Sequence, residues 1–228
     1  VRIHEFFASG GTPSEIQAGT QTREVYDLER TWTARLIAFY RQAHSNDFSQ
    51  TVAAVKDFAR LDALKGRLRD EMRAKALQEI FEQYQSIYVE AGYIHFALLR
   101  ELHRLLPGKN QLSTFYSQEE YFRPRINRRQ ILGPGDVLTL IYTWRPKYQG
   151  PRADLLAAQS LIYNKVVENQ EIQDDTERCP HAEDEIQAVR LARSLDLDQC
   201  ESLYAKIRHE TTLEARKKTR DWLDRMRQ

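Results

Sequence analysis

Glycine and cysteine are both scarce in this chain of 228 residues, which has nine glycines and two cysteines. An all-β fold needs many tight turns, and so low a glycine content argues against one. Cys179 and Cys200 are too few for a disulfide framework, which is typical of proteins in a reducing compartment. Together with the lack of a signal-like segment, this favours a cytoplasmic location.

Long hydrophobic stretches are also missing. The longest nearly apolar runs, Tyr93–Leu99 and Val137–Tyr142, are far shorter than the roughly 20 residues that a membrane-spanning helix needs. We therefore expect no transmembrane segment in this chain. Its first residue is Val1 rather than Met, which leaves open that the sequence is a piece of a longer protein or had an anchor removed.

Familiar catalytic and ligand-binding motifs are absent. The stretch Gly133-Pro134-Gly135-Asp136 lacks the lysine and the following Ser or Thr of a phosphate-binding loop, and no Gly-x-Ser-x-Gly elbow occurs. Two cysteines and two histidines near the C-terminus have gaps too irregular for a typical zinc site, namely Cys179, His181, Cys200 and His209. We therefore expect no cofactor, no metal and no identifiable catalytic residue, and enzymatic activity stays an open question.

Helical periodicity dominates the first half of the chain. Thr12-Pro13-Ser14-Glu15 has the form of a capping box, and apolar residues then recur every three or four positions from Thr22 to Ala43. A second periodic run extends from Phe48 to Leu106. Unbroken, it would measure roughly 88 Å, so we expect a break near Gly66, with Gly92 as the alternative.

The second half also favours helices. Val137–Trp144 is compatible with a strand, but its spacing and a capping Asp136 favour a short helix. Further helices are expected from Pro151 to about Asp174, after Pro180, around Leu203 and Ile207, and after the capping box Thr211-x-x-Glu214. The predicted fold is an all-α bundle of seven to nine helices, with a long, irregular basic and aromatic loop in the middle.

Charge divides the chain into three parts although the net charge is only +1. Residues 1–108 are balanced, residues 109–152 carry eight basic and three acidic side chains, and residues 153–228 carry twelve and sixteen. We interpret 1–108 as an N-terminal bundle, 109–150 as a connecting segment, and 151–228 as C-terminal helices that pack on or extend the bundle. A single domain is the alternative.

The most distinctive stretch is residues 115–152, here called the basic–aromatic segment. Arginine forks suit phosphate or carboxylate groups, and aromatic faces can stack on bases or on arginine planes. The candidate binding residues are Arg123, Arg125, Arg128, Arg129, Trp144, Arg145 and Lys147. The alternative is internal: the aromatics anchor the segment to the core, and the arginines pair with the acidic run at 168–185.

A second candidate site lies on the long periodic run. Tyr84, Tyr88, Gly92 and His95 would line a pocket between helices if Gly92 marks a kink. Close helix packing at Gly92 and a core histidine bonded to a tyrosine form the competing interpretation.

Three functional hypotheses follow. The leading one is a non-enzymatic interaction or adaptor module, in which the basic–aromatic segment binds an acidic protein partner or mediates self-association. The second is binding of nucleic acid or anionic lipid through the same segment, although a net charge of +1 counts against it. The third is a helical enzyme or ligand-binding protein with the pocket near His95.

Overall fold

The computed structural model describes residues 12–106, 112–172 and 178–226, and within them every regular element is a helix. A 3-10 turn precedes nine α-helices in this part of the chain, which confirms the all-α prediction. The elements are η1 (Pro13–Glu15), α2 (Gln21–Ala43), α3 (Phe48–Phe81), α4 (Phe96–Leu105), α5 (Glu119–Ile126), α6 (Pro134–Trp144), α7 (Pro151–Val166), α8 (Pro180–Arg193), α9 (Leu197–Ile207) and α10 (Thr212–Met226).

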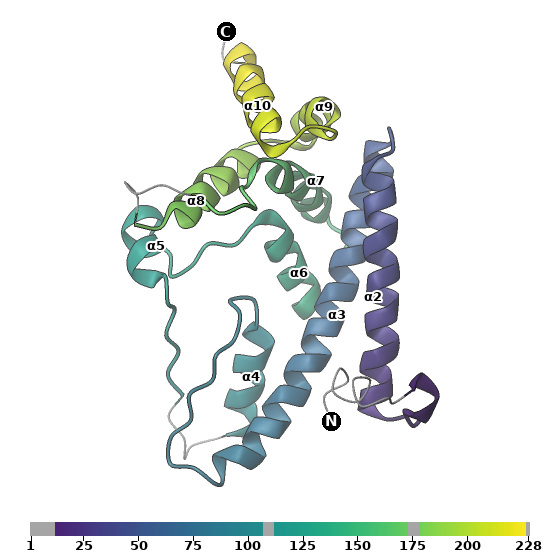
Figure 1. Cartoon of the computed structure of the whole chain (residues 1–228), viewed down its shortest axis with the longest axis vertical. Helices are drawn as coiled ribbons and strands as arrows, with labels where there is room; N and C mark the ends of the chain where they lie inside the picture. Colours follow the sequence, from purple (N-terminus) through teal and green to yellow (C-terminus); the bar gives the residue numbers. More distant parts are fainter. Residues whose placement is uncertain (1–11, 107–111, 173–177, 227–228) are drawn as a thin grey trace.

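Helices α2 and α3 form an antiparallel hairpin along one side of the molecule (Figure 1). Their starts are capped by side chains, because Thr20 Oγ1 accepts from the amide of Arg23 at 3.2 Å and Asp47 Oδ1 accepts from that of Gln50 at 2.9 Å. Within the hairpin, Trp32 Nε1 donates to Asp62 Oδ1 at 2.9 Å. The hairpin is the frame on which α4 and α6 are mounted.

The prediction of a break near Gly66 is wrong, because α3 runs through this residue without interruption. A mid-helix glycine costs about 1 kcal/mol relative to alanine. Burial of one face of α3 offsets that cost; among the residues that it buries are Val52, Val55, Ala59, Ala63 and Leu68.

The periodic run is interrupted instead at residues 82–95, which include Gly92 and are not helical. Helix α4 then folds back on α3 and buries Leu98 and Leu102 against Ala74. A hydrogen bond between His95 Nδ1 and Asp70 Oδ1, 2.7 Å long, fixes the end of the interruption. The chain thereby replaces one long rod with a shorter one and a packed helix.

The middle of the chain is less irregular than predicted, since α5 lies in it before α6. The expectation of a helix rather than a strand at 137–144 is confirmed. The N-cap of α6 is Gly133 rather than Asp136; the Asp136 carboxylate lies one turn inside and accepts from the Gly133 amide at 2.9 Å.

Helix α7 starts at Pro151 as predicted but ends at Val166, earlier than the expected end near Asp174, which lies outside the described residues. Two contacts stop it: Arg216 Nε donates to the Val166 carbonyl at 2.6 Å, and Asp184 Oδ2 accepts from the Glu168 amide at 2.8 Å. The first half of the second predicted capping box is present, with the Glu214 amide 3.4 Å from Thr211 Oγ1.

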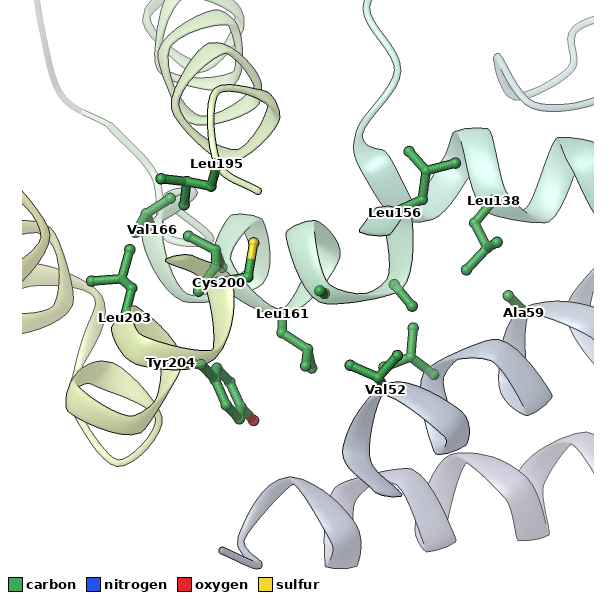
Figure 2. Packing of buried hydrophobic residues seen from close by; sticks show 14 of the residues in the cluster. Val52, Ala59, Leu138, Leu156, Leu161, Val166, Leu195, Cys200, Leu203 and Tyr204 are labelled. Atoms are coloured by element: carbon green, nitrogen blue, oxygen red, sulfur yellow. The ribbon is translucent and has the colours of Figure 1, made fainter. Parts of the chain in front are cut away.

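The main core surrounds α7 (Figure 2). This helix packs against α3, α6, α8, α9 and α10, and it is buried on nearly all sides, as a central helix must be. The cluster includes Val52, Ala59, Leu138, Leu156, Leu161, Val166, Leu195, Cys200, Leu203 and Tyr204.

Two smaller clusters attach the peripheral helices. Tyr121 and Phe122 of α5 pack with Ile186 and Val189 of α8. On α3, Ala74 contributes to the cluster that holds α4. Helices α4 and α6 both contact α3 and lie on the same flank of it, one beyond the other along its length (Figure 1).

Candidate interaction surface

Three arginines of the basic–aromatic segment have acidic partners within the chain. Arg123 and Arg129 both bind Glu119, at 2.9 Å and 2.7 Å, and Arg125 lies 3.8 Å from Glu183. Arg125 also stacks on the ring of Tyr121, 3.7 Å from its centroid. These three arginines therefore stabilise α5 and its contact with α8.

The remaining predicted cations differ. Arg128, Arg145 and Lys147 are exposed, and in the described part of the chain no ion pair involves them. The structure thus separates the seven predicted binding residues into two groups.

Trp144 belongs to the second group and lies in an open groove between α4 and α6. The groove has a volume of about 510 Å³. Its wall on α6 is formed by Leu140 and Trp144, and Trp144 is 41% exposed. Its wall on α4 is formed by Phe96, Leu99, Arg100 and His103.

Helix α4 is apolar on two sides, and this explains how the groove arises. Leu98 and Leu102 face α3, whereas Phe96 and Leu99 line the groove. A helix with two apolar faces needs two neighbours, and α6 is mounted on α3 rather than packed closely against α4. The second face of α4 is thereby left partly open.

The charged side chains at and near this groove include several cations. The guanidinium carbon of Arg100 lies 4.9 Å from the centroid of the Trp144 ring, a cation–π geometry. Arg145 and Lys147 lie one and three residues after Trp144 in the sequence. Arg104 differs from them because Glu101 binds it at 2.7 Å. The groove therefore combines a largely apolar lining with the positive charge of Arg100.

The acidic run is partly neutralised inside the chain. Arg216 binds Asp184 at 2.5 Å, and Glu183 is shared between Arg125 and the hydroxyl of Tyr121, which donates at 3.3 Å. The expected pairing between the basic–aromatic segment and this run is present at Arg125–Glu183, within the part of the run that the structure describes. Asp174, Asp175 and Glu177 lie outside the described residues.

The four candidate pocket residues do not line the groove between α4 and α6. Tyr84 and Tyr88 lie in the irregular segment 82–95 and are 61% and 86% exposed. Gly92 lies in the same segment, and a Cβ added to it would meet the imidazole of His95 at 3.5 Å. The partner of His95 is an aspartate rather than the expected tyrosine.

That aspartate, Asp70, holds the segment in place. Besides His95, it accepts from Arg73 Nη1 at 3.1 Å and from the backbone amide of Leu98 at 3.2 Å. The side chain of Asp70 is 3% exposed, so the carboxylate is compensated almost entirely by these donors.

A second polar cluster joins α6, α7 and α8. The Tyr93 hydroxyl donates to Asp136 at 3.2 Å, and the Tyr163 hydroxyl donates to Glu185 at 3.3 Å. Loss of hydration raises the pKa of both carboxyl groups, and the charge of Asp136 raises the pKa of Glu185 further. These groups were not predicted, because two acids 49 positions apart carry no sequence signal of their proximity.

The groove residues on α4 were also missed by the sequence analysis, although a signal existed. Phe96, Leu99 and His103 follow a helical spacing of their own beside that of Leu98 and Leu102. Treating 48–106 as one periodic run merged the two faces.

Two absences concern the residues that the structure describes, 12–106, 112–172 and 178–226. No group of three or more histidine, cysteine, aspartate or glutamate side chains there is arranged to hold a metal ion. Every helix in those ranges is too short or too polar to cross a lipid bilayer.

No protein-family model matches the sequence, and no solved structure matches it. An archaeal protein from Archaeoglobus fulgidus, described as an uncharacterized protein, is 28% identical over 181 residues. The alignment covers 79% of this chain and 61% of that relative, so the chain spans about three fifths of the relative's length.

Proposed function

We propose that this protein is an interaction module whose α4–α6 groove binds an acidic, amphipathic segment of a partner protein. The observation that carries the proposal is the partly exposed Trp144, which forms one wall of an apolar groove with Arg100 over its ring. Exposed tryptophan and arginine side chains in one patch are typical of binding hot spots.

The apolar part of the groove supports a helical or extended ligand with hydrophobic anchors. Phe96, Leu99 and Leu140 offer surface that α4 and α6 do not cover for each other. An amphipathic helix laid in such a groove would insert side chains spaced by three or four residues.

The charge around the groove supports an acidic ligand. Arg100, Arg145 and Lys147 have no acidic partner in the described residues, so a ligand carboxylate meets cations that are not already engaged. Complementary charge raises the association rate and rejects basic competitors.

The test is a titration with a panel of synthetic acidic amphipathic peptides, about four turns long, with leucines every three or four positions. Binding should bury Trp144 and change its fluorescence. The change can be assigned to Trp144 because Trp222 is already buried and Trp32 is hydrogen-bonded to Asp62 in the α2–α3 hairpin. A panel in which lysine replaces glutamate should not bind. Labelled peptide anisotropy supplies a second signal that does not depend on tryptophan.

The matched variants are R145E/K147E and R220E. The double reversal should weaken binding about tenfold, whereas reversal of Arg220, an exposed cation on α10, should leave it unchanged. Equal affinity for acidic and basic peptides, or an unaffected R145E/K147E variant, would contradict the proposal.

The same variants can also identify two other kinds of ligand. Concentration-dependent association in sedimentation that R145E/K147E abolishes would identify a second copy of the chain as the ligand. Steeply salt-dependent binding of labelled nucleic acid, in place of peptide, would favour the nucleic-acid hypothesis.

A further inference from the structure

The turn between α2 and α3, residues 44–47 (here called the hairpin turn), is fastened to the end of α9 by Arg208. Its guanidinium group donates through Nη1 to the Ser45 carbonyl at 2.6 Å and through Nη2 to the side-chain oxygen of Asn46. These contacts join the N-terminal hairpin to the C-terminal helices, beside which the end of α2 lies (Figure 1).

A histidine supplies the remaining acceptor of the same guanidinium group. Arg208 Nε donates to His209 Nε2 at 3.0 Å. A ring nitrogen accepts a hydrogen bond only while it carries no proton, so this bond requires the neutral form of His209. Every nitrogen of the Arg208 guanidinium group thus has an acceptor, and one acceptor is lost when His209 is protonated.

A second histidine lies against the first. The ring of His44, at the C-cap of α2, is nearly parallel to that of His209, with 11° between the planes and 6.0 Å between the centroids. When both rings are protonated, three positive charges meet at this junction, since Arg208 is always charged. Among the described residues, no ion pair involves any of the three, so no carboxylate bound to them offsets the repulsion.

The carboxylates nearest in the sequence are already engaged. Asp47 caps α3 by accepting from the Gln50 amide at 2.9 Å, and Glu210 is bound by Lys218 at 2.6 Å. The charged and titratable groups around the junction are Arg41 and His44 on α2, Asp47 in the hairpin turn, Glu201, Tyr204 and Arg208 at α9, and His209, Glu210 and Lys218 beyond it.

The packing at this junction is open. A cleft of about 610 Å³ lies between the hairpin turn and α9, lined mainly by polar side chains of the turn and of the start of α3, with Glu201 opposite. The other direct contact is the Tyr204 hydroxyl, which donates to the Ala43 carbonyl at 3.3 Å. Water can replace polar contacts of this kind, so the junction can separate while the main core stays packed.

We propose that Arg208, His209 and His44 form a pH-operated clamp, which holds the hairpin turn against α9 at neutral pH and releases it in mild acid. Histidine is the side chain that ordinarily gains its charge between about pH 8 and pH 5. Protonation of His209 removes the acceptor of Arg208 Nε and places a like charge beside it, and protonation of His44 adds another. Release widens the polar cleft, and the clamp is separate from the α4–α6 groove.

A distance measurement between two spin labels tests the release. The labels are attached at A38C near the end of α2 and at S202C on α9, both exposed positions, in a C179S background in which the remaining Cys200 is buried. At about pH 7.5 we expect one narrow distance distribution. At about pH 5.5 a population at longer distances should grow about tenfold, because a hydrogen bond is lost and like charges are added.

Variants of His209 separate its charge from its other contacts. H209Q keeps an acceptor for Arg208 but cannot gain a proton, so its distances should be the same at both pH values. H209K carries a fixed positive charge and should show the longer population at both. H103Q is the control, because His103 Nδ1 lies 2.8 Å from the Leu99 carbonyl of its own helix, and it should behave like the unmodified chain.

Two results would overturn the proposal. The first is an unmodified chain whose distances do not change between the two pH values. The second is an acid-induced change that persists in H209Q.

Discussion

Asp70 shows how one residue organises a segment of this protein. Its side chain is only 3% exposed, and its carboxylate accepts hydrogen bonds from α3 itself, from His95 and from the first turn of α4. A buried carboxylate is stable only when such donors replace the water that it has lost. The irregular segment before α4 is therefore anchored at its end by a polar contact as well as by apolar packing.

Replacing Asp70 with alanine should lower the free energy of unfolding by about 2–3 kcal/mol, because three donors lose their acceptor. Urea denaturation measures this loss. D57A is the matched control: Asp57 forms an exposed pair with Arg60 on the same helix, so its loss should cost about 0.5 kcal/mol or less. Equal losses in the two variants would show that Asp70 has no special role.

Asp136 and Glu185 make stability depend on pH. Burial raises the pKa of both groups in the folded state; the hydrogen bonds from Tyr93 and Tyr163 act against this, and the charges of Asp62 and Asp184 add to it. A raised folded-state pKa gives stability that is full below the unfolded pKa, about 4, and is lost as pH rises through the folded value.

We therefore expect E185Q to gain stability relative to the unmodified chain at neutral pH and to lose that advantage in mild acid. Glutamine keeps an acceptor for the Tyr163 hydroxyl, so the comparison isolates the charge. Denaturation midpoints across a pH series measure the effect. A difference that does not vary with pH would contradict this explanation.

At the scale of helices, α3 is the element that sequence reasoning treated least well. Its start at Phe48 and its apolar face follow from periodicity, but its end at Phe81 does not, because the periodic pattern continues to Leu106 and glycine was given too much weight as a breaker. Gly66 lies in a helix held by contacts with α2, α4, α6 and α7, which no local pattern reveals. The break at 82–95 depends on the return of α4 to α3 and on Asp70, which are long-range contacts.

Gly66 offers a direct test at this scale. A Cβ at Gly66 would have no atom within 4 Å, so G66A should stabilise the protein by about 0.5–1 kcal/mol through helix propensity. The control is G19A, because Gly19 has φ of +78° and alanine is strained there. Thermal unfolding should move in opposite directions for the two variants.

At the scale of the whole molecule, one core links helices from all three charge-defined parts of the chain. Residues of α3, α6 and α7 to α10 belong to the same cluster. Composition and periodicity predicted the helical class and most helix starts, such as those at Pro151 and Pro180. They did not predict which helix is central, or that α4 and α6 leave a groove, because both depend on packing between distant segments.

The reactivity of the Cys200 thiol can measure how often this core opens. It is fully buried, and burial raises the pKa of its thiol to about 12, whereas Cys179 is partly exposed. In a C179S background, we expect a thiol reagent to modify Cys200 only as fast as the whole core opens. The rate should rise in parallel with global unfolding as urea is added. Fast modification in native buffer would show that α9 opens separately.

The central position of α7 has a consequence for the order in which this protein can be assembled on the ribosome. Helices α3 and α6 are synthesised before α7, but α8, α9 and α10, which complete its surroundings, are synthesised after it. The nascent chain therefore cannot bury α7 fully until its last helices have emerged. Until then, apolar side chains on the unfinished side of α7 remain accessible to chaperones.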